Sequence, residues 1–142
     1  MNLETDLIIH LIARIREKAN RFIIAELKSH HIEDLIPVHG DILFALFKYG
    51  QIPMKTIAQI VDRKKSTVTT LVDKLIHLGY VQKKADETDH RYALISLTKK
   101  GQQLAFQLQD ISDKLLNKVY KDMPVEERIH LVKNLRMIND NW

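Results

Sequence analysis

Lysine and hydroxyl side chains are concentrated in one short stretch of the sequence, between residues 62 and 74. Lysine amines neutralise phosphate charge, and hydroxyl groups form hydrogen bonds with phosphate oxygens and base edges. Serine and threonine at the start of a helix serve more commonly as caps, so the surrounding elements must decide between the two roles. The candidate phosphate- and base-contacting residues are Lys64, Lys65, Ser66, Thr67, Thr69, Thr70 and Lys74.

Two short amphipathic helices are predicted on either side of the charged turn 62–65. Apolar residues recur at helical spacing in 54–61 and again from Ser66 to Gly79. Two such helices joined by a tight polar turn form a helix-turn-helix, whose second helix enters the major groove of DNA. The predicted buried residues are Met54, Ile57, Ala58 and Val61 in the first helix and Val68, Leu71, Val72, Leu75 and Leu78 in the second.

A β-hairpin is predicted directly after the second helix. Gly79 can take the left-handed conformation that ends a helix, and segments 80–84 and 92–97 both alternate apolar and polar residues. The connector 85–91 is short enough to join these segments as two half-buried antiparallel strands. A hairpin that follows a recognition helix is a wing, and Thr98 then caps another helix.

Four linked motifs in this region resemble the MarR family of winged helix-turn-helix regulators. The resemblance implies a fold that is mainly α with a small β-wing, and a dimeric DNA-binding regulator. It further implies that the wing arginine, Arg91, enters the minor groove and that the start of the recognition helix enters the major groove. The motifs are Ser66-Thr-Val-Thr-Thr-Leu-Val-Asp-Lys-Leu, Leu78-Gly-Tyr-Val, Asp86-Glu-Thr-Asp-His-Arg91 and Leu97-Thr-Lys-Lys-Gly101.

Two aspartates, Asp86 and Asp89, flank the basic tip of the predicted wing. Their carboxylates would repel phosphate, so we expect them to orient Arg91 or Arg63 through charge-assisted hydrogen bonds. The alternative interpretation is a solvated acidic turn. Serine and threonine specify bases weakly compared with bidentate side chains, so sequence selectivity is expected to depend on Arg91 in a narrow minor groove.

The turn departs from the family pattern at Lys64, which stands where a capping serine is common. Either the cap moves to Ser66 or the helix start is capped less well. Lys64 and Lys65 are expected to contact phosphates rather than bases.

A helix predicted at 38–49 is apolar on most sides and should form the buried scaffold. After it, Gln51–Ile52 is expected to add a third strand beside the wing. Pro53 then suits the first position of the next helix.

Long apolar stripes flank the central module on both sides. A single helix is predicted from Leu3 to about Ser29, and two more are predicted within 102–142. We expect 3–29 and 102–142 to form a helical dimerisation platform around a winged module at 38–101, within one domain of residues 1–142. The alternative is a monomer whose termini pack on each other. The predicted dimerisation residues are Leu3, Leu7, Leu11, Leu115, Val119, Ile129, Val132, Leu135 and Ile138.

Composition limits the class of protein. The chain has 142 residues, of which 45% are hydrophobic, enough for one compact domain. It contains no cysteine, which excludes disulfides, thiolate metal sites and a thiol oxidation sensor. No membrane-spanning run or signal peptide is visible, so a cytoplasmic protein without a membrane partner is expected. Residues 54–101 carry 10 Lys or Arg against 5 Asp or Glu, so the net positive charge lies in the module predicted to face DNA.

Metal, effector and catalytic sites have weaker signals. His30, His31 and His39 lie near acidic residues, yet no helical His pair fixes a metal site, so none is predicted. No cofactor or catalytic constellation is evident, and no enzyme activity is expected. The resemblance implies an effector pocket between the platform and the winged module, although the same residues suit a plain core. Its lining would be Ile12, Ile15, His39, Leu43, Phe47 and Phe106.

The leading hypothesis is therefore a homodimeric transcription regulator that binds a palindromic double-stranded DNA operator. Repression needs only DNA affinity, so a repressor released by a small-molecule effector is the simplest mechanism, and activation stays open. Two alternatives remain: a metal-responsive regulator, and a winged-helix protein-interaction module that does not bind an operator. Loss of DNA binding on direct test would favour the second alternative.

Overall fold

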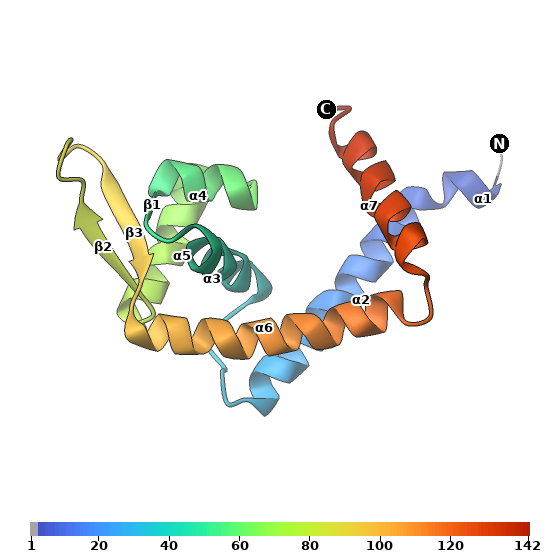
Figure 1. Ribbon diagram of the computed structural model, residues 1–142, viewed down its shortest axis with the longest axis horizontal. Coiled ribbons are helices and arrows are strands. Elements are labelled where there is room, and N and C mark those ends of the chain that lie inside the picture. The colour runs from blue at the N-terminus through green and yellow to red at the C-terminus, as the bar shows by residue number, and fades with distance from the viewer. Residues whose placement is uncertain (1–2) are drawn as a thin grey trace.

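The computed structural model describes residues 3–142, which form seven helices and three short strands. Figure 1 shows a winged module and a group of terminal helices at opposite ends of the long helix α6. The winged module contains α3 (Pro37–Tyr49), β1 (Ile52–Pro53), α4 (Met54–Val61), α5 (Lys65–His77), β2 (Val81–Ala85) and β3 (Ala93–Leu97). The remaining helices are α1 (Leu3–Asp6), α2 (Ile8–Ser29), α6 (Lys99–Tyr120) and α7 (Val125–Asn139).

The N-terminal helix differs from the prediction of one helix over 3–29. It is broken between Asp6 and Ile8, and Figure 1 shows α1 turning away from the direction of α2. The bond from Leu11 N to Leu7 O, at 2.9 Å, keeps Leu7 attached to α2, so the break lies before it. No residue of α1 is buried within the chain. Since helices are held mainly by tertiary packing, a four-residue turn without a buried residue is only weakly held in line with α2.

Helix α3 is the buried scaffold that the sequence predicts, although it begins at Pro37 rather than Val38. Ile42 and Leu43 are fully buried, and the helix packs against α2, α4, α5 and α6. Pro37 holds Ile36 in an extended conformation, at φ −110° and ψ 163°. The ring of His39 then reaches back, and its Nδ1 accepts a hydrogen bond from Ile36 N at 3.0 Å. This bond satisfies a backbone donor at the start of α3.

His39 is expected to make the stability of the fold dependent on pH. The side chain is 2% exposed. Burial lowers its pKa, and the positive charge of Lys74 lowers that pKa further. As pH falls below about 6.5, the unfolded chain binds a proton that the folded chain does not, so stability present above that pH is lost. We expect urea unfolding to show this loss between pH 7 and pH 5, at no more than about 1.4 kcal/mol per pH unit from this residue.

The matched variant for this prediction is His39→Gln. Glutamine at the third helical position can also accept the bond from Ile36 N, but it does not titrate. The variant should therefore lose less stability than the wild-type protein over the same pH range. Equal slopes for the two proteins would show that His39 is not the titrating group.

The three strands form an antiparallel sheet in the order β1-β3-β2, which confirms the predicted wing and third strand. Val81 pairs with Leu97 at the base of the wing, and Ala85 pairs with Ala93 near its tip. β2 was expected to be half-buried along its length, but only Val81 is buried and Gln82–Ala85 are exposed. The hairpin extends beyond the core, as Figure 1 shows, so the alternating pattern has no core to face. Pro53 ends β1 and precedes α4 instead of beginning it.

A tight junction joins the end of α5 to the start of α6. Thr98 accepts a hydrogen bond from Gly101 N at 3.1 Å, which confirms it as the cap of α6, and donates its hydroxyl to Gly79 O at 2.6 Å. Lys100 Nζ donates to Leu78 O at 2.8 Å. Gly101 lies so close to Tyr80 that a Cβ built on it would be 1.9 Å from the Tyr80 carbonyl oxygen. These contacts explain why the Leu-Thr-x-x-Gly pattern has a capping threonine at Thr98 and a residue without a side chain at Gly101.

Helix α6 packs against both the winged module and the N-terminal helix α2. Its first half is buried in the chain's own core through Leu104, Leu108 and Ile111. This half lies within the predicted platform segment 102–142, so its apolar stripe is not free for another subunit. Its second half packs near α2, where Lys114 Nζ lies 3.3 Å from Glu26 Oε2. Within residues 3–142, none of the helices combines the length and the apolar character needed to cross a bilayer.

Candidate nucleic-acid interface

Helix α5 has one buried face and one polar face. Val68, Val72 and Leu75 are completely buried, which confirms the apolar stripe of this helix. The opposite face carries the exposed residues Ser66, Thr67, Thr70, Asp73 and Lys74, while Thr69 is half-buried at its edge. The structure therefore brings the hydroxyl residues and Lys74 together on one accessible helix surface.

The start of α5 resolves the two alternatives left open at Lys64. Lys64 is the N-cap residue, in an extended conformation, and no side chain caps the helix. Lys65 is the first helical residue, one position before the predicted start, so the cap does not move to Ser66. The start of α5 therefore lacks a side-chain cap, and its first backbone N–H groups remain available to an anion.

The hydroxyl groups of α5 differ in their hydrogen bonds. Thr69 Oγ1 donates to Lys65 O at 2.9 Å, and Thr70 Oγ1 donates to Ser66 O at 3.2 Å. Within the described residues, the structure assigns no side-chain hydrogen bond to Ser66 or Thr67. The first turn therefore offers free hydroxyl donors, whereas the second turn has used its donors within the helix.

Arg91 is held at the wing by a bidentate pair with Asp89. Its Nε donates to Asp89 Oδ1 at 2.9 Å and its Nη2 donates to Oδ2 at 2.7 Å. The guanidinium lowers the pKa of the Asp89 carboxyl, and the carboxylate in turn raises the pKa of Arg91. The arginine side chain is still 83% exposed. This arrangement fixes its direction while it leaves Nη1 free of Asp89.

Asp86 differs from the expectation that it orients an arginine. Its Oδ1 accepts from the backbone N of Thr88 at 2.9 Å and from the Thr88 hydroxyl at 2.7 Å. These bonds lower the pKa of Asp86. Aspartate readily bonds the backbone two residues later, and this local turn outcompetes a longer reach to Arg91 or Arg63. Asp86 shapes the wing loop, and Arg63 donates to Asp62 O at 3.0 Å.

Two surface features of the wing were not predicted from the sequence. The guanidinium of Arg91 lies over the Tyr92 ring, 5.9 Å from its centroid, although Tyr92 was considered only as a strand residue. Lys83 and Lys84 are both exposed on β2, where an alternating strand would have buried one of them. Adjacent Arg and Tyr residues at a strand end were the available signal for the first feature.

Comparison with known proteins decides the family. Residues 35–101 match the family described as winged helix DNA-binding domain. The transcriptional regulator SarZ of Staphylococcus haemolyticus is 30% identical over 115 residues, which cover 81% of this chain and 75% of SarZ. The chain belongs to the MarR family. It is a DNA-binding transcriptional regulator of the MarR type, as the sequence predicts.

Solved MarR-family structures share this fold over nearly the whole chain. The regulator BpsR of Bordetella bronchiseptica, whose DNA binding is regulated by 6-hydroxynicotinic acid, superposes with a TM-score of 0.82 at 19% identity and covers 94% of this chain and 93% of its own. A MarR variant from E. coli in complex with operator DNA has a TM-score of 0.80 at 19% identity and covers 91% of both chains. At these identities the likeness establishes the fold.

The histidines considered as metal ligands have separate surroundings in this MarR-family chain. His30 Nδ1 lies 2.8 Å from Glu26 O, His31 is exposed, and His39 is buried at the start of α3. Within residues 3–142, no three His, Asp or Glu side chains are grouped as a metal site would require.

The residues considered for an effector pocket are also divided. Leu43 and His39 lie in the closed core, whereas Ile12 and Ile15 are exposed. Phe47 and Phe106 form an edge-to-face ring pair with centroids 5.4 Å apart. A cavity of about 230 Å³ lies between α2 and α6, and it includes Ile15 from this candidate set. It is lined by Ile15, Lys18, Ala19, Phe22, Leu115, Lys118 and Val119.

Proposed function

We propose that the protein acts as a homodimer that binds a palindromic operator and represses transcription until a small molecule releases it. The observation that carries the proposal is the combination of a positively charged winged module with a separate group of helices whose apolar side chains are exposed in one chain. A two-fold dimer presents two recognition helices to half-sites roughly 34 Å apart, which matches a palindrome. Operator binding also requires the compartment of the chromosome, in agreement with the cytoplasmic location expected from the sequence.

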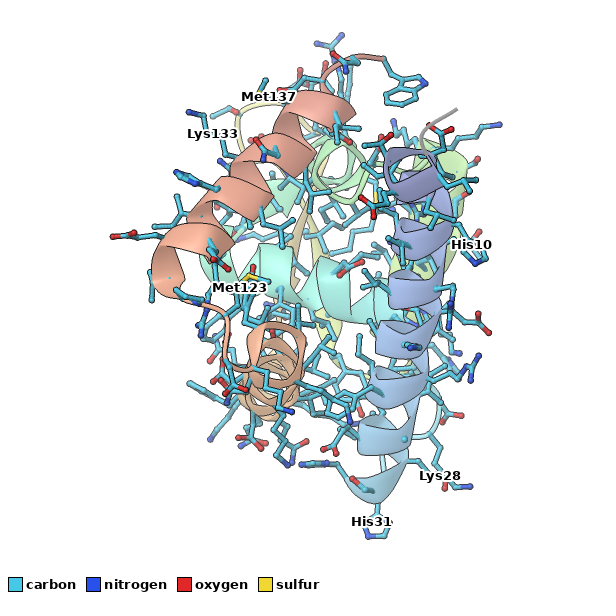
Figure 2. The ribbon with its side chains drawn as sticks, turned by 90° about the vertical axis from the view of Figure 1, so that its right-hand side faces the viewer. His10, Lys28, His31, Met123, Lys133 and Met137 are labelled. Carbon is cyan, nitrogen blue, oxygen red and sulfur yellow. The ribbon has the colours of Figure 1, made fainter. Side chains whose placement is uncertain are left out.

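The apolar surface of the platform supports dimerisation. Figure 2 views the molecule from this side, with α2 and α7 standing apart and α6 seen end-on below α7, beside the lower part of α2. Scattered apolar residues are normal on a surface, but many large exposed apolar side chains on the same few helices favour an interaction site. Leu115 and Ile138 are half-buried, and the other predicted contacts are Leu3 at 70% exposure, Leu7 at 47%, Leu11 at 47%, Val119 at 46%, Ile129 at 61%, Val132 at 36% and Leu135 at 41%.

Leu135→Glu is expected to convert the dimer to monomers, because it places a charge in the apolar surface of α7. Leu135 is 41% exposed within one chain, so the substitution should leave the fold of the protomer intact. Light scattering would give the molar mass, and circular dichroism would report the helix content. His130→Glu is the control, since it adds a carboxylate to the polar side of the same helix. A Leu135→Glu protein that remains dimeric would refute this platform surface.

Lys65→Ala is expected to weaken binding to every duplex by the same factor, because a phosphate contact carries no sequence information. Lys65 is exposed at the first position of α5. The slope of log affinity against log salt should fall by about one for each phosphate that the lysine no longer neutralises. Lys28→Ala removes a lysine at the far end of α2, where Figure 2 shows it on the outer edge, and should change neither quantity. An unchanged salt slope in Lys65→Ala would remove Lys65 from the set of phosphate-binding residues.

Effector control is proposed from the arrangement of the two modules and from the regulation of BpsR by 6-hydroxynicotinic acid. The cavity between α2 and α6 lies in the platform, on the helix that continues to the winged module. A molecule bound there would act on DNA affinity only if it distinguishes the bound and free conformations.

The experiment that tests the proposal is fluorescence anisotropy of the purified protein with duplexes selected from its own genome, at two salt concentrations. Tight, salt-dependent binding of two subunits to a near-palindrome is the expected result. Weak binding that is equal for all duplexes would contradict operator recognition and favour a protein-interaction role. Restoration of tight binding by an added metal ion would instead favour a metal-responsive regulator.

A further inference from the structure

The hydroxyl group of Thr70 is hydrogen-bonded to the backbone of its own helix, whereas its methyl group is not engaged in this way. A hydroxyl carries one proton, and the Thr70 proton is donated to Ser66 O, four residues earlier, at 3.2 Å. What remains accessible to a ligand is the Cγ2 methyl and the acceptor capacity of the oxygen. Thr69 makes the same kind of bond to Lys65 O at 2.9 Å, but it is half-buried.

Thr70 occupies the centre of the polar face of α5. Residues three and four positions apart are neighbours on a helix surface. Its neighbours one turn earlier are Ser66 and Thr67, and those one turn later are Asp73 and Lys74, all of them exposed. A helix that lies with this face in a major groove brings Thr70 toward the floor of the groove, with charged or hydroxyl groups on either side of it.

We propose that Thr70 recognises thymine in each operator half-site through its methyl group and not through a hydroxyl donor. Among the four bases, only thymine places a methyl group in the major groove, and a threonine methyl makes apolar contact with it. The Thr70 hydroxyl keeps its hydrogen bond to Ser66 O and so has no proton to donate to a base acceptor, which favours contact through the methyl group. The proposal rests on the operator binding proposed above and names the base that the recognition helix reads.

The test removes thymine methyl groups one at a time. The probe is the tightest-binding duplex that the wild-type protein selects from a random-sequence pool, with each thymine replaced in turn by deoxyuridine. Deoxyuridine keeps the base pairing and the O4 acceptor and lacks only the methyl. Each half-site should contain one position at which a single replacement weakens binding about fourfold. Replacement at that position in both half-sites should weaken binding about fifteenfold.

Two variants assign that effect to Thr70. Thr70→Val keeps the shape and the methyl but loses the hydroxyl, so it should bind the original duplex within about twofold of wild type. It should also retain the penalty for deoxyuridine. Thr70→Ser keeps the hydroxyl and loses the methyl, so it should bind more weakly and no longer distinguish thymine from deoxyuridine at that position. Both substitutions are on an exposed helix surface, and thermal unfolding would verify that the variants are folded.

Three outcomes would overturn the proposal. The first is a duplex whose deoxyuridine replacements all leave affinity unchanged. The second is a Thr70→Val protein that loses affinity while Thr70→Ser keeps it, since the hydroxyl would then be the reading group. The third is a deoxyuridine penalty that persists in Thr70→Ser, since another residue would then contact the methyl. A wild-type protein that selects no duplex at all would instead contradict operator binding itself.

Discussion

Arg91→Ala is expected to weaken binding to the selected operator about a hundredfold, because each subunit of a dimer gives up a minor-groove interaction of about 1.4 kcal/mol. The structure shows why the effect should be large for an exposed side chain. Asp89 fixes the guanidinium by accepting from Nε and Nη2, at 2.9 and 2.7 Å. Less conformational entropy is then lost when Nη1 meets base acceptors in the groove. Competition anisotropy with the selected duplex would measure the change.

The Arg91 prediction also includes selectivity. Arginine favours the narrow minor groove of A-tracts, so the wild-type protein should prefer A-tracts over G·C pairs at the position under the wing. Arg91→Ala should lose that preference. Arg91→Lys is the matched variant, because it keeps the charge and the salt dependence but lacks the planar fork that pairs with Asp89. If Arg91→Ala binds within twofold of wild type with its preference intact, the wing does not enter the minor groove.

Gly101→Ala is expected to destabilise the protein by about 3 kcal/mol or more, a large fraction of the stability of a domain of this size. The added Cβ would lie 1.9 Å from Tyr80 O and 3.2 Å from Leu97 Cδ2. A carbonyl oxygen of the backbone cannot turn aside as a flexible side chain does, so α6 must move away from the wing. The bonds of Thr98 to Gly79 and to Gly101 would then lengthen. Urea unfolding followed by circular dichroism would measure the loss.

Gly40→Ala provides the control for this substitution. Gly40 also lies within a helix, but a Cβ added to it would meet nothing within 4 Å. Alanine should therefore stabilise α3 by about 0.5 to 1 kcal/mol, through the smaller entropy of the unfolded chain. Opposite signs for the two glycines would identify close packing at Tyr80 as the cause. A neutral Gly101→Ala protein would contradict the close approach.

The elements of the winged module could be predicted from the sequence because their signals are local. The stripe of Val68, Val72 and Leu75 and the turn at Gly79, at φ 84°, each follow from a few adjacent residues. The break at Leu7 could not be predicted in the same way. No Gly or Pro marks it, and the direction of a first turn that has no buried residue is not encoded locally.

The candidate interface was predictable in composition more than in detail. Residue types and charge indicate which face of α5 is expected to meet DNA, since burial of one face leaves the other exposed. Hydrogen-bond partners were less predictable, because several short polar side chains compete for the same groups. Asp86 bonds Thr88 and not an arginine, and Thr70 bonds the helix backbone. Such competition is decided by differences of a fraction of a kcal/mol, which sequence patterns do not resolve.

The junction at Gly79, Thr98 and Gly101 couples the start of α6 to the end of the recognition helix, so a tilt of α6 would move that helix. The helix has 22 residues, which gives it a length of about 33 Å. A tilt of about 5° at its platform end would displace the recognition helix by about 3 Å, close to the spacing of roughly 3.4 Å between successive base pairs. A rearrangement too small to disturb the packing of the platform would thus shift the recognition helix by about one base-pair step along the DNA. The stiffness of the junction at the other end of α6, where Gly101 packs against Tyr80, decides how much of that movement reaches the recognition helix.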